Sequence, residues 1–260
     1  MPGDSVLLLA HDLPHIVAIL FACLDLNLTL IPLHPDYEDS MYESVIRECQ
    51  PKFTILEARL LQLQKISTAK CPGHILLLLN ISTNWLSSSP GSMANARSCH
   101  KRDGGRTNAA IIFHSSGTTA QPKALHYSRL QLVTFLYWQQ LLFNNFQDAA
   151  NSSSGLFPSP RINTLPLVHW GGLSFCLQAL LQQRCVYLLQ GFAACELLPL
   201  VKRAGCQLLM LIPSMYRELL PLLQHKSATG DLRYCLTMGE AMSPGLSRAL
   251  YVTNGIKLYT

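Results

Sequence analysis

The chain has 260 residues, enough for one large domain or two small ones with a sizeable buried core. Hydrophobic residues make up 49% of it and charged residues only 13%, against roughly 25% in a typical soluble protein, which excludes a disordered chain and a highly charged coiled coil. The net charge of +5, from 20 Lys and Arg against 15 Asp and Glu, is too small and too scattered to indicate nucleic-acid binding. So little charge indicates that much of the chain is buried or that part of its surface is normally covered.

The nine cysteines lie at irregular spacing without a CxxC pair, which is typical of a reduced protein and not of a disulfide-rich secreted domain. The first residues do not form a basic leader. The longest apolar run, Leu13–Leu24, contains Pro14 and His15 and is too short to span a bilayer. The histidines show no HxxH or HExxH spacing, so no metal site is predicted. We therefore expect a cytoplasmic protein without a membrane span.

Short apolar runs alternate with helical spacing over the first 80 or so residues. Val6–Leu9 reads as a buried strand, and Leu13–Leu26 as a helix with Asp12 as its N-cap. The next elements are a strand over Thr29–Leu33, a helix over Ser40–Glu48, a strand over Phe53–Leu56, a helix over Glu57–Gln64 and a strand over His74–Leu79. This alternation predicts an α/β fold with a parallel sheet.

From Ser82 to Thr107 the pattern stops, and Ser, Asn, Gly and basic residues dominate. The pattern then resumes, and strands and helices alternate to the end of the chain. We expect strands over 109–113, 163–167, 185–189, 208–211, 234–237 and 257–260, and helices over 128–143, 173–182, 194–204, 214–223 and 244–251. The prediction is two layered α/β subdomains with largely parallel sheets, residues 1–82 and 107–260, joined by a linker over residues 83–106.

The polar loop after the predicted strand 109–113 carries the strongest chemical signal. It reads HSSGTTAQPK, from His114 to Lys123. Backbone N–H groups of such a loop can point into one concavity, hydroxyls add donors, and the lysine adds a positive charge, which together favour a polyphosphate. A Walker loop is disfavoured because Pro122 and Ala124 stand where that motif needs a glycine and a hydroxyl. The alternative is an ordinary Ser/Thr/Gly connector with a surface lysine.

This loop resembles the phosphate-binding signature of the AMP-forming adenylating enzymes, which include acyl-CoA synthetases, luciferases and the adenylation domains of peptide synthetases. Their pattern, [YF]-T-S-G-[ST]-T-G-x-P-K-G, is matched by Phe113, by residues 115–119, and by Pro122 and Lys123, whereas alanines replace two glycines. A histidine at position 114 is similar to the variant in fungal reductase-type (NRPS-like) adenylation domains. Four further segments follow the family's order: residues 3–35, 165–172, 212–216 and 231–243.

The resemblance implies a partial acyl-CoA synthetase-like N-terminal domain, with the family's C-terminal lid domain outside this chain. It implies ATP and Mg²⁺ as cofactors, a small carboxylic acid as substrate, and CoA or a phosphopantetheine carrier as thiol partner. No metal ligand is predicted within the chain, and no nucleic-acid partner. The implied phosphate-binding residues are His114, Ser115, Ser116, Gly117, Thr118, Thr119 and Lys123, the adenine-contacting residues are Gly239, Glu240 and Ala241, and His169 is the catalytic candidate beside the acyl pocket.

The resemblance predicts ATP-dependent activation of a carboxylic acid to an acyl-adenylate. The alternative is a catalytically inactive, truncated remnant or an interaction protein of the same fold. For single residues, alternatives also stay open: His169 as an ordinary buried histidine, and Gly239–Ala241 as a plain strand–helix turn. Tyr216 and Trp170 could line an acyl pocket, but aromatic residues in apolar segments more often lie in the core.

Overall fold

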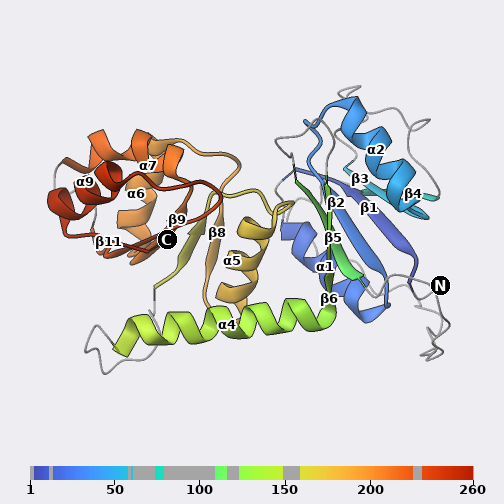
Figure 1. The fold of residues 1–260 in the computed structure, drawn as a ribbon, viewed down its shortest axis with the longest axis horizontal. Coiled ribbons are helices and arrows are strands. Elements are labelled where there is room, and N and C mark those ends of the chain that lie inside the picture. The colour runs from blue at the N-terminus through green and yellow to red at the C-terminus, as the bar shows by residue number, and fades with distance from the viewer. Residues whose placement is uncertain are drawn as a thin grey trace, which may run out of the picture. The chain divides into compact units, whose positions relative to one another are not determined.

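The computed structural model describes residues 3–11, 14–57, 60, 74–78, 109–115, 123–148, 159–224 and 230–259. The chain divides into two compact units, one of residues 1–11 and 19–129 and the other of residues 12–18 and 130–260. Each unit has its own largely parallel sheet (Figure 1). Among the described helices, none is both long enough and apolar enough to cross a membrane.

The sheet of the first unit has the strand order β4-β3-β1-β2-β5-β6. Its strands are parallel except for β6, which pairs antiparallel with β5. Helices cover both faces of a parallel sheet, so side chains on both sides of each strand are buried. The strands of such a sheet are therefore continuously apolar in sequence. The strands are β1 (Ser5–Leu9), β2 (Thr29–Leu33), β3 (Phe53–Glu57), β4 (His74–Leu78), β5 (Ala109–Ser115) and β6 (Lys123–Ser128).

Of the helices that the structure describes in this unit, α1 (Pro14–Asp25) and α2 (Asp39–Cys49) pack on the sheet. Leu7 and Leu9 of β1 share one buried cluster with Val45 of α2. Since side chains alternate along a strand, Val6 and Leu8 point to the opposite face, where Figure 1 shows α1. All four of these β1 side chains are buried, so β1 lies at the centre of the unit.

The sheet of the second unit is parallel throughout, with the order β11-β10-β9-β7-β8. The helices α6, α7 and α9 contribute to a large apolar cluster with this sheet, and α5 contributes Phe175 to a second, smaller cluster. The elements are α4 (Arg129–Asp148), β7 (Arg161–Asn163), α5 (Trp170–Leu181), β8 (Val186–Leu188), α6 (Ala194–Ala204), β9 (Leu208–Leu211), α7 (Pro213–Leu219), the 3₁₀ helix η2 (Leu220–Gln224), β10 (Tyr234–Thr237), α9 (Pro244–Asn254) and β11 (Lys257–Tyr259).

The predicted α/β class with two largely parallel sheets is confirmed, but strand β6 was not predicted. Its segment was expected to be the end of a turn and the start of a helix. Lys123, Leu125 and His126 are exposed, so the segment lacks the apolar run that marks the other strands. Because β5 and β6 join the first sheet, the two units divide after Arg129. The predicted linker 83–106 and most of the predicted helix over Glu57–Gln64 lie outside the described residues.

The predicted strand over residues 163–167 is wrong, because the strand is Arg161–Asn163. The Asn163 side chain takes the place of further sheet pairing, since its Oδ1 accepts the Leu165 backbone N–H at 3.0 Å. Pro166 then has no N–H to donate. The chain therefore leaves the sheet after Asn163, and α5 begins at Trp170, earlier than the sequence indicated.

Candidate functional site

The predicted phosphate loop lies at the carboxyl end of β5. The structure describes its two ends, and residues 116–122, which include Ser116, Gly117, Thr118 and Thr119, lie outside the described residues. Ser115, the last residue of β5, pairs with Lys123, the first residue of β6. The Lys123 side chain is exposed. The sheet thus holds both ends of the loop next to each other, with a cation at the point where the loop returns.

His114, the first residue of the predicted loop, lies within β5 and is only 4% exposed. Its Nε2 lies 4.0 Å from Cys49 Sγ, and its Nδ1 has no hydrogen-bond partner among the described residues. Burial, together with the charge of His126, lowers the pKa of His114 to about 4. The imidazole is therefore neutral at pH 7 and adds no positive charge to the loop, in contrast to Lys123.

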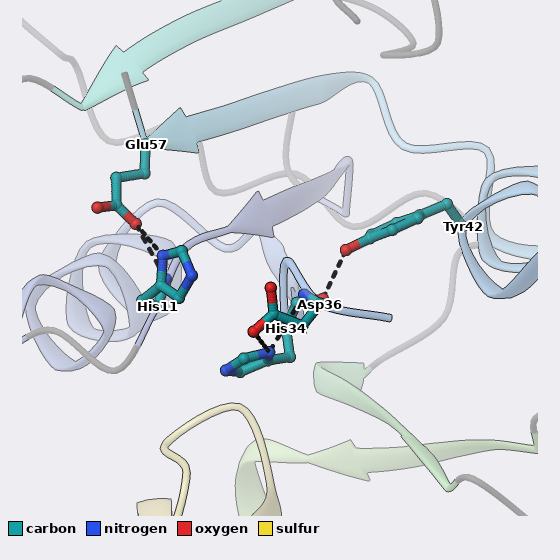
Figure 2. Close-up of polar contacts among 5 residues, drawn as sticks. All are labelled: His11, His34, Asp36, Tyr42 and Glu57. Carbon is teal, nitrogen blue, oxygen red and sulfur yellow. Dashed lines mark hydrogen bonds and ion pairs between the residues drawn. The ribbon is translucent and has the colours of Figure 1, made fainter. Parts of the chain in front are cut away.

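A second polar group, which the sequence analysis missed, lies at the carboxyl ends of β1 and β3 (Figure 2). The buried Glu57 carboxylate accepts the His11 backbone N–H at 3.1 Å and lies 2.8 Å from His11 Nδ1. Because a carboxylate only accepts hydrogen bonds, His11 Nδ1 must carry the proton. This pair joins two segments that are 46 residues apart in the sequence.

His34, which follows β2, extends this group. Its ring meets the His11 ring edge-on, with centroids 5.6 Å apart. The Asp36 backbone N–H donates to His34 Nδ1 at 3.2 Å, and the Tyr42 hydroxyl donates to the His34 carbonyl at 2.6 Å (Figure 2). The available sequence signal was a polar residue at the end of each of these buried strands or within two residues after it. The described residues contain no cluster of three or more His, Cys, Asp or Glu side chains suited to a metal ion.

In the second unit, Asn163 fixes the loop that carries His169. The Asn163 amide nitrogen donates to the Gly172 carbonyl at 2.9 Å, in addition to the bond with Leu165, and the side chain is buried. A Cβ atom on Gly172 would lie 2.3 Å from the Pro166 carbonyl oxygen. Only glycine allows the first turn of α5 to approach the loop this closely.

His169 occupies the N-cap position of α5 and is half-buried. Its backbone N–H donates to the Pro166 carbonyl at 3.1 Å, and its own carbonyl accepts the Leu173 N–H at 3.0 Å. The ring does not cap the helix. The backbone therefore fixes this position through its own hydrogen bonds, without using the imidazole as a cap.

The predicted adenine-contacting turn, Gly239–Ala241, follows β10 and is exposed. Gly239 adopts a φ of 85°, a backbone conformation that residues other than glycine rarely adopt. The preceding residue, Met238, contacts the start of α5, since a Cβ on Gly171 would lie 2.4 Å from Met238 Sδ. The structure therefore brings the 239–241 turn and the His169 loop together at the carboxyl ends of β10 and β7.

Tyr216 is fully buried in the core, whereas Trp170, at the start of α5, is only partly buried. The Tyr216 hydroxyl lies 3.1 Å from the Leu209 carbonyl oxygen and 2.8 Å from the Leu236 carbonyl oxygen, so it joins β9 to β10. Burial raises the pKa of Tyr216 well above its ordinary value. The Trp170 ring packs edge-on against Phe135, with centroids 4.8 Å apart.

Comparisons with known proteins show the family and the fold of the chain. The family model described as AMP-binding enzyme matches residues 1–260. Among curated proteins, the chain is similar to the human mitochondrial acyl-coenzyme A synthetase ACSM6, at 25% identity over 256 residues that cover 94% of this chain and 50% of that protein. The chain thus spans half the length of this relative.

The fold is shared with solved structures. The o-succinylbenzoate CoA synthetase of Bacillus subtilis, in complex with the acyl-adenylate intermediate OSB-AMP, matches with a TM-score of 0.75 at 15% identity, over 99% of this chain and 48% of that chain. ATP-bound MatB from Rhodopseudomonas palustris matches with a TM-score of 0.75 at 22% identity, over 99% and 49%. VinN in complex with L-aspartate matches with a TM-score of 0.71 at 16% identity, over 99% and 62%. These likenesses confirm the predicted acyl-CoA synthetase-like fold.

Proposed function

Because this chain belongs to the family of AMP-binding enzymes, we propose that the protein activates a small carboxylic acid with ATP. A carboxylate oxygen attacks the α-phosphorus, the bond to the β-phosphate breaks, and acyl-adenylate and pyrophosphate form. A thiol of CoA or of a phosphopantetheine carrier then attacks the acyl carbonyl and releases AMP. Relatives of the fold hold ATP, an acyl-adenylate or an amino acid, which supports this class of reaction.

The observation that carries the proposal is the pairing of Ser115 with Lys123 at the carboxyl edge of a parallel sheet. Ligands of α/β sheets bind at this edge. The loop hydroxyls and Lys123 hold the ATP phosphates, and positioning and charge neutralisation account for most of the rate. Bound Mg²⁺ would supply further neutralisation of the phosphate charge next to Lys123. The neutral His114 supports the loop from within the sheet.

In the second unit, we assign adenine binding to the turn Gly239–Ala241 and contact with the reacting carboxylate to His169. The contact between Met238 and Gly171 supports this assignment, because it fixes the turn and the His169 loop relative to each other. A half-buried imidazole in this position can donate to an oxygen of the acyl-adenylate. The assignment is tested by replacing His169 with alanine and with asparagine, of which only the second keeps a donor.

The subfamily and the location are further parts of the proposal. His114 supports a fungal reductase-type adenylation domain, as the resemblance implied. The described cysteines are unpaired, which supports a reducing compartment such as the cytoplasm. The alternative, an inactive protein of the same fold, is supported by the alanines at two usual glycine positions, Ala120 and Ala124.

ATP binding by the 260-residue chain tests the proposal. Isothermal titration with MgATP should give binding that Lys123→Ala weakens about tenfold or more, as expected for the loss of a charge-assisted contact. Lys257→Ala removes an equally exposed lysine at the start of β11 and is the matched control. Equal affinity of the two variants would refute the assignment of the loop. Pyrophosphate exchange with a panel of carboxylates then distinguishes the active protein from an inactive binder.

A further inference from the structure

Helix α4 has an unusual composition for a helix at the surface. Its 20 residues, RLQLVTFLYWQQLLFNNFQD, contain charged side chains only at the first and last positions, Arg129 and Asp148. One side of the helix packs on the second unit. Leu132 is buried, Phe135 contacts Trp170, and the Gln140 side-chain oxygen Oε1 accepts from the Gln178 side-chain amide at 2.5 Å. Phe135 and Gln140 on this side therefore contact α5 of the same unit.

The opposite side of α4 is exposed and carries five large apolar side chains together with the polar Gln131 and Thr134. Its exposed fractions are 75% for Leu130, 65% for Val133, 60% for Tyr137, 59% for Trp138 and 55% for Leu142. A large side chain carries about 150–250 Å² of surface, so the five expose on the order of 600 Å². This is the upper end for the largest apolar patch of a monomer, about 300–600 Å².

The chemistry of the helix selects among possible partners. A helix that lies on a membrane surface carries Lys and Arg along its polar side. Between residues 130 and 147 α4 has no charged residue, so it lacks this feature. The same lack of charge favours pairing with an identical helix, because two copies bring together no like charges. In an antiparallel pair, Arg129 lies at the same end as Asp148 of the partner subunit, and the helix dipoles oppose each other.

We infer that the exposed face of α4 is the contact surface between two copies of this chain. The contact is isologous, with the two α4 helices antiparallel and the twofold axis near Trp138. Two such faces bury on the order of 1,200 Å² in total, which is the lower limit of a standard stable interface, about 1,200–2,000 Å². This surface does not depend on the proposed enzymatic function.

Sedimentation velocity over a wide range of protein concentration tests the proposal. The wild-type chain should show a reversible monomer–dimer equilibrium, and Val133→Glu should weaken the dimer about tenfold or more because each dimer would bury two carboxylates. The substitution should leave the fold intact, because the site is exposed and Glu has a higher helix propensity than Val. Val252→Glu makes the same change at a residue of α9 that is 72% exposed, and it should leave the dimer unchanged.

Tryptophan fluorescence, to which Trp138 contributes as one of three tryptophans, supplies a second measurement. The emission should shift to shorter wavelength as the wild-type chain associates, and this shift should be absent in Val133→Glu. A wild-type chain that stays monomeric at all concentrations would overturn the proposal. So would a dimer that survives both Val133→Glu and Tyr137→Glu, or flotation of the chain with anionic lipid vesicles through α4.

Discussion

The buried, neutral His114 makes the stability of the first unit depend on pH. Its pKa is lowered from 6.5 to about 4 in the folded chain, first because of burial and then because of His126. The unfolded chain therefore binds more protons than the folded chain between these two values. Stability from this group is fully present above about pH 6.5 and is lost as the pH falls toward 4.

The size of the effect follows from the difference between the two pKa values. One unit of difference corresponds to about 1.4 kcal/mol, so His114 should contribute about 3 kcal/mol to the free energy of unfolding at neutral pH relative to pH below 4. At pH 5 about 2 kcal/mol of this should already be lost. That loss is a large fraction of the free energy of unfolding of a typical folded protein, which is about 5–15 kcal/mol.

Urea unfolding at pH 7.5 and pH 5 measures the effect. His114→Leu removes the titrating group and keeps a buried apolar side chain of similar size, so this variant should lose about 2 kcal/mol less than the wild type between the two pH values. His126→Gln is the control. It removes only the second cause of the shift and should keep most of the wild-type loss. Equal losses in the wild type and in His114→Leu would refute the reasoning.

Two further substitutions test the packing of the second unit. Tyr216→Phe removes the hydroxyl that lies between the Leu209 and Leu236 carbonyls, and it should lower the free energy of unfolding by about 1–2 kcal/mol in thermal melts; an unchanged melting temperature would contradict the bridging role. Gly172→Ala places a Cβ 2.3 Å from a backbone oxygen and should destabilise by at least about 2 kcal/mol, whereas Gly245→Ala, with open space around its Cβ, should cost less than about 0.5 kcal/mol. Similar losses in the two alanine variants would show that the close contact at Gly172 is not limiting.

The fold was largely predictable because its strands are short apolar runs separated by helical spacing. A run such as Val6–Leu9 has few alternatives to a strand buried on both faces. The strand Lys123–Ser128 escaped this reasoning because it lies at the edge of the sheet and exposes half of its side chains. The early end of β7 depends on the side-chain bonds of Asn163, which no periodicity reveals.

The candidate site divides in the same way. The loop from His114 to Lys123 was found from its residue types, because phosphate binding needs hydroxyls, glycine and a cation close together in the sequence. The group of His11, His34 and Glu57 could not be found this way, since its members come from three strands and meet only in the folded sheet. Likewise, the neutral state of His114 follows from burial, which a single sequence position does not report.

Because Ser115 pairs with Lys123, the loss of chain entropy on closing the loop occurs during folding and not during ligand binding. The sheet brings the two ends together during folding, so a ligand bound by the loop does not have to close it. Substitutions that separate β5 from β6 should therefore weaken ligand binding even where the substituted residue does not contact the ligand. In such a variant the entropy cost of closing the loop would reduce the free energy of binding. In the opposite direction, a bound polyphosphate would slow amide hydrogen exchange along β6, at the edge of the sheet, before any change in the core.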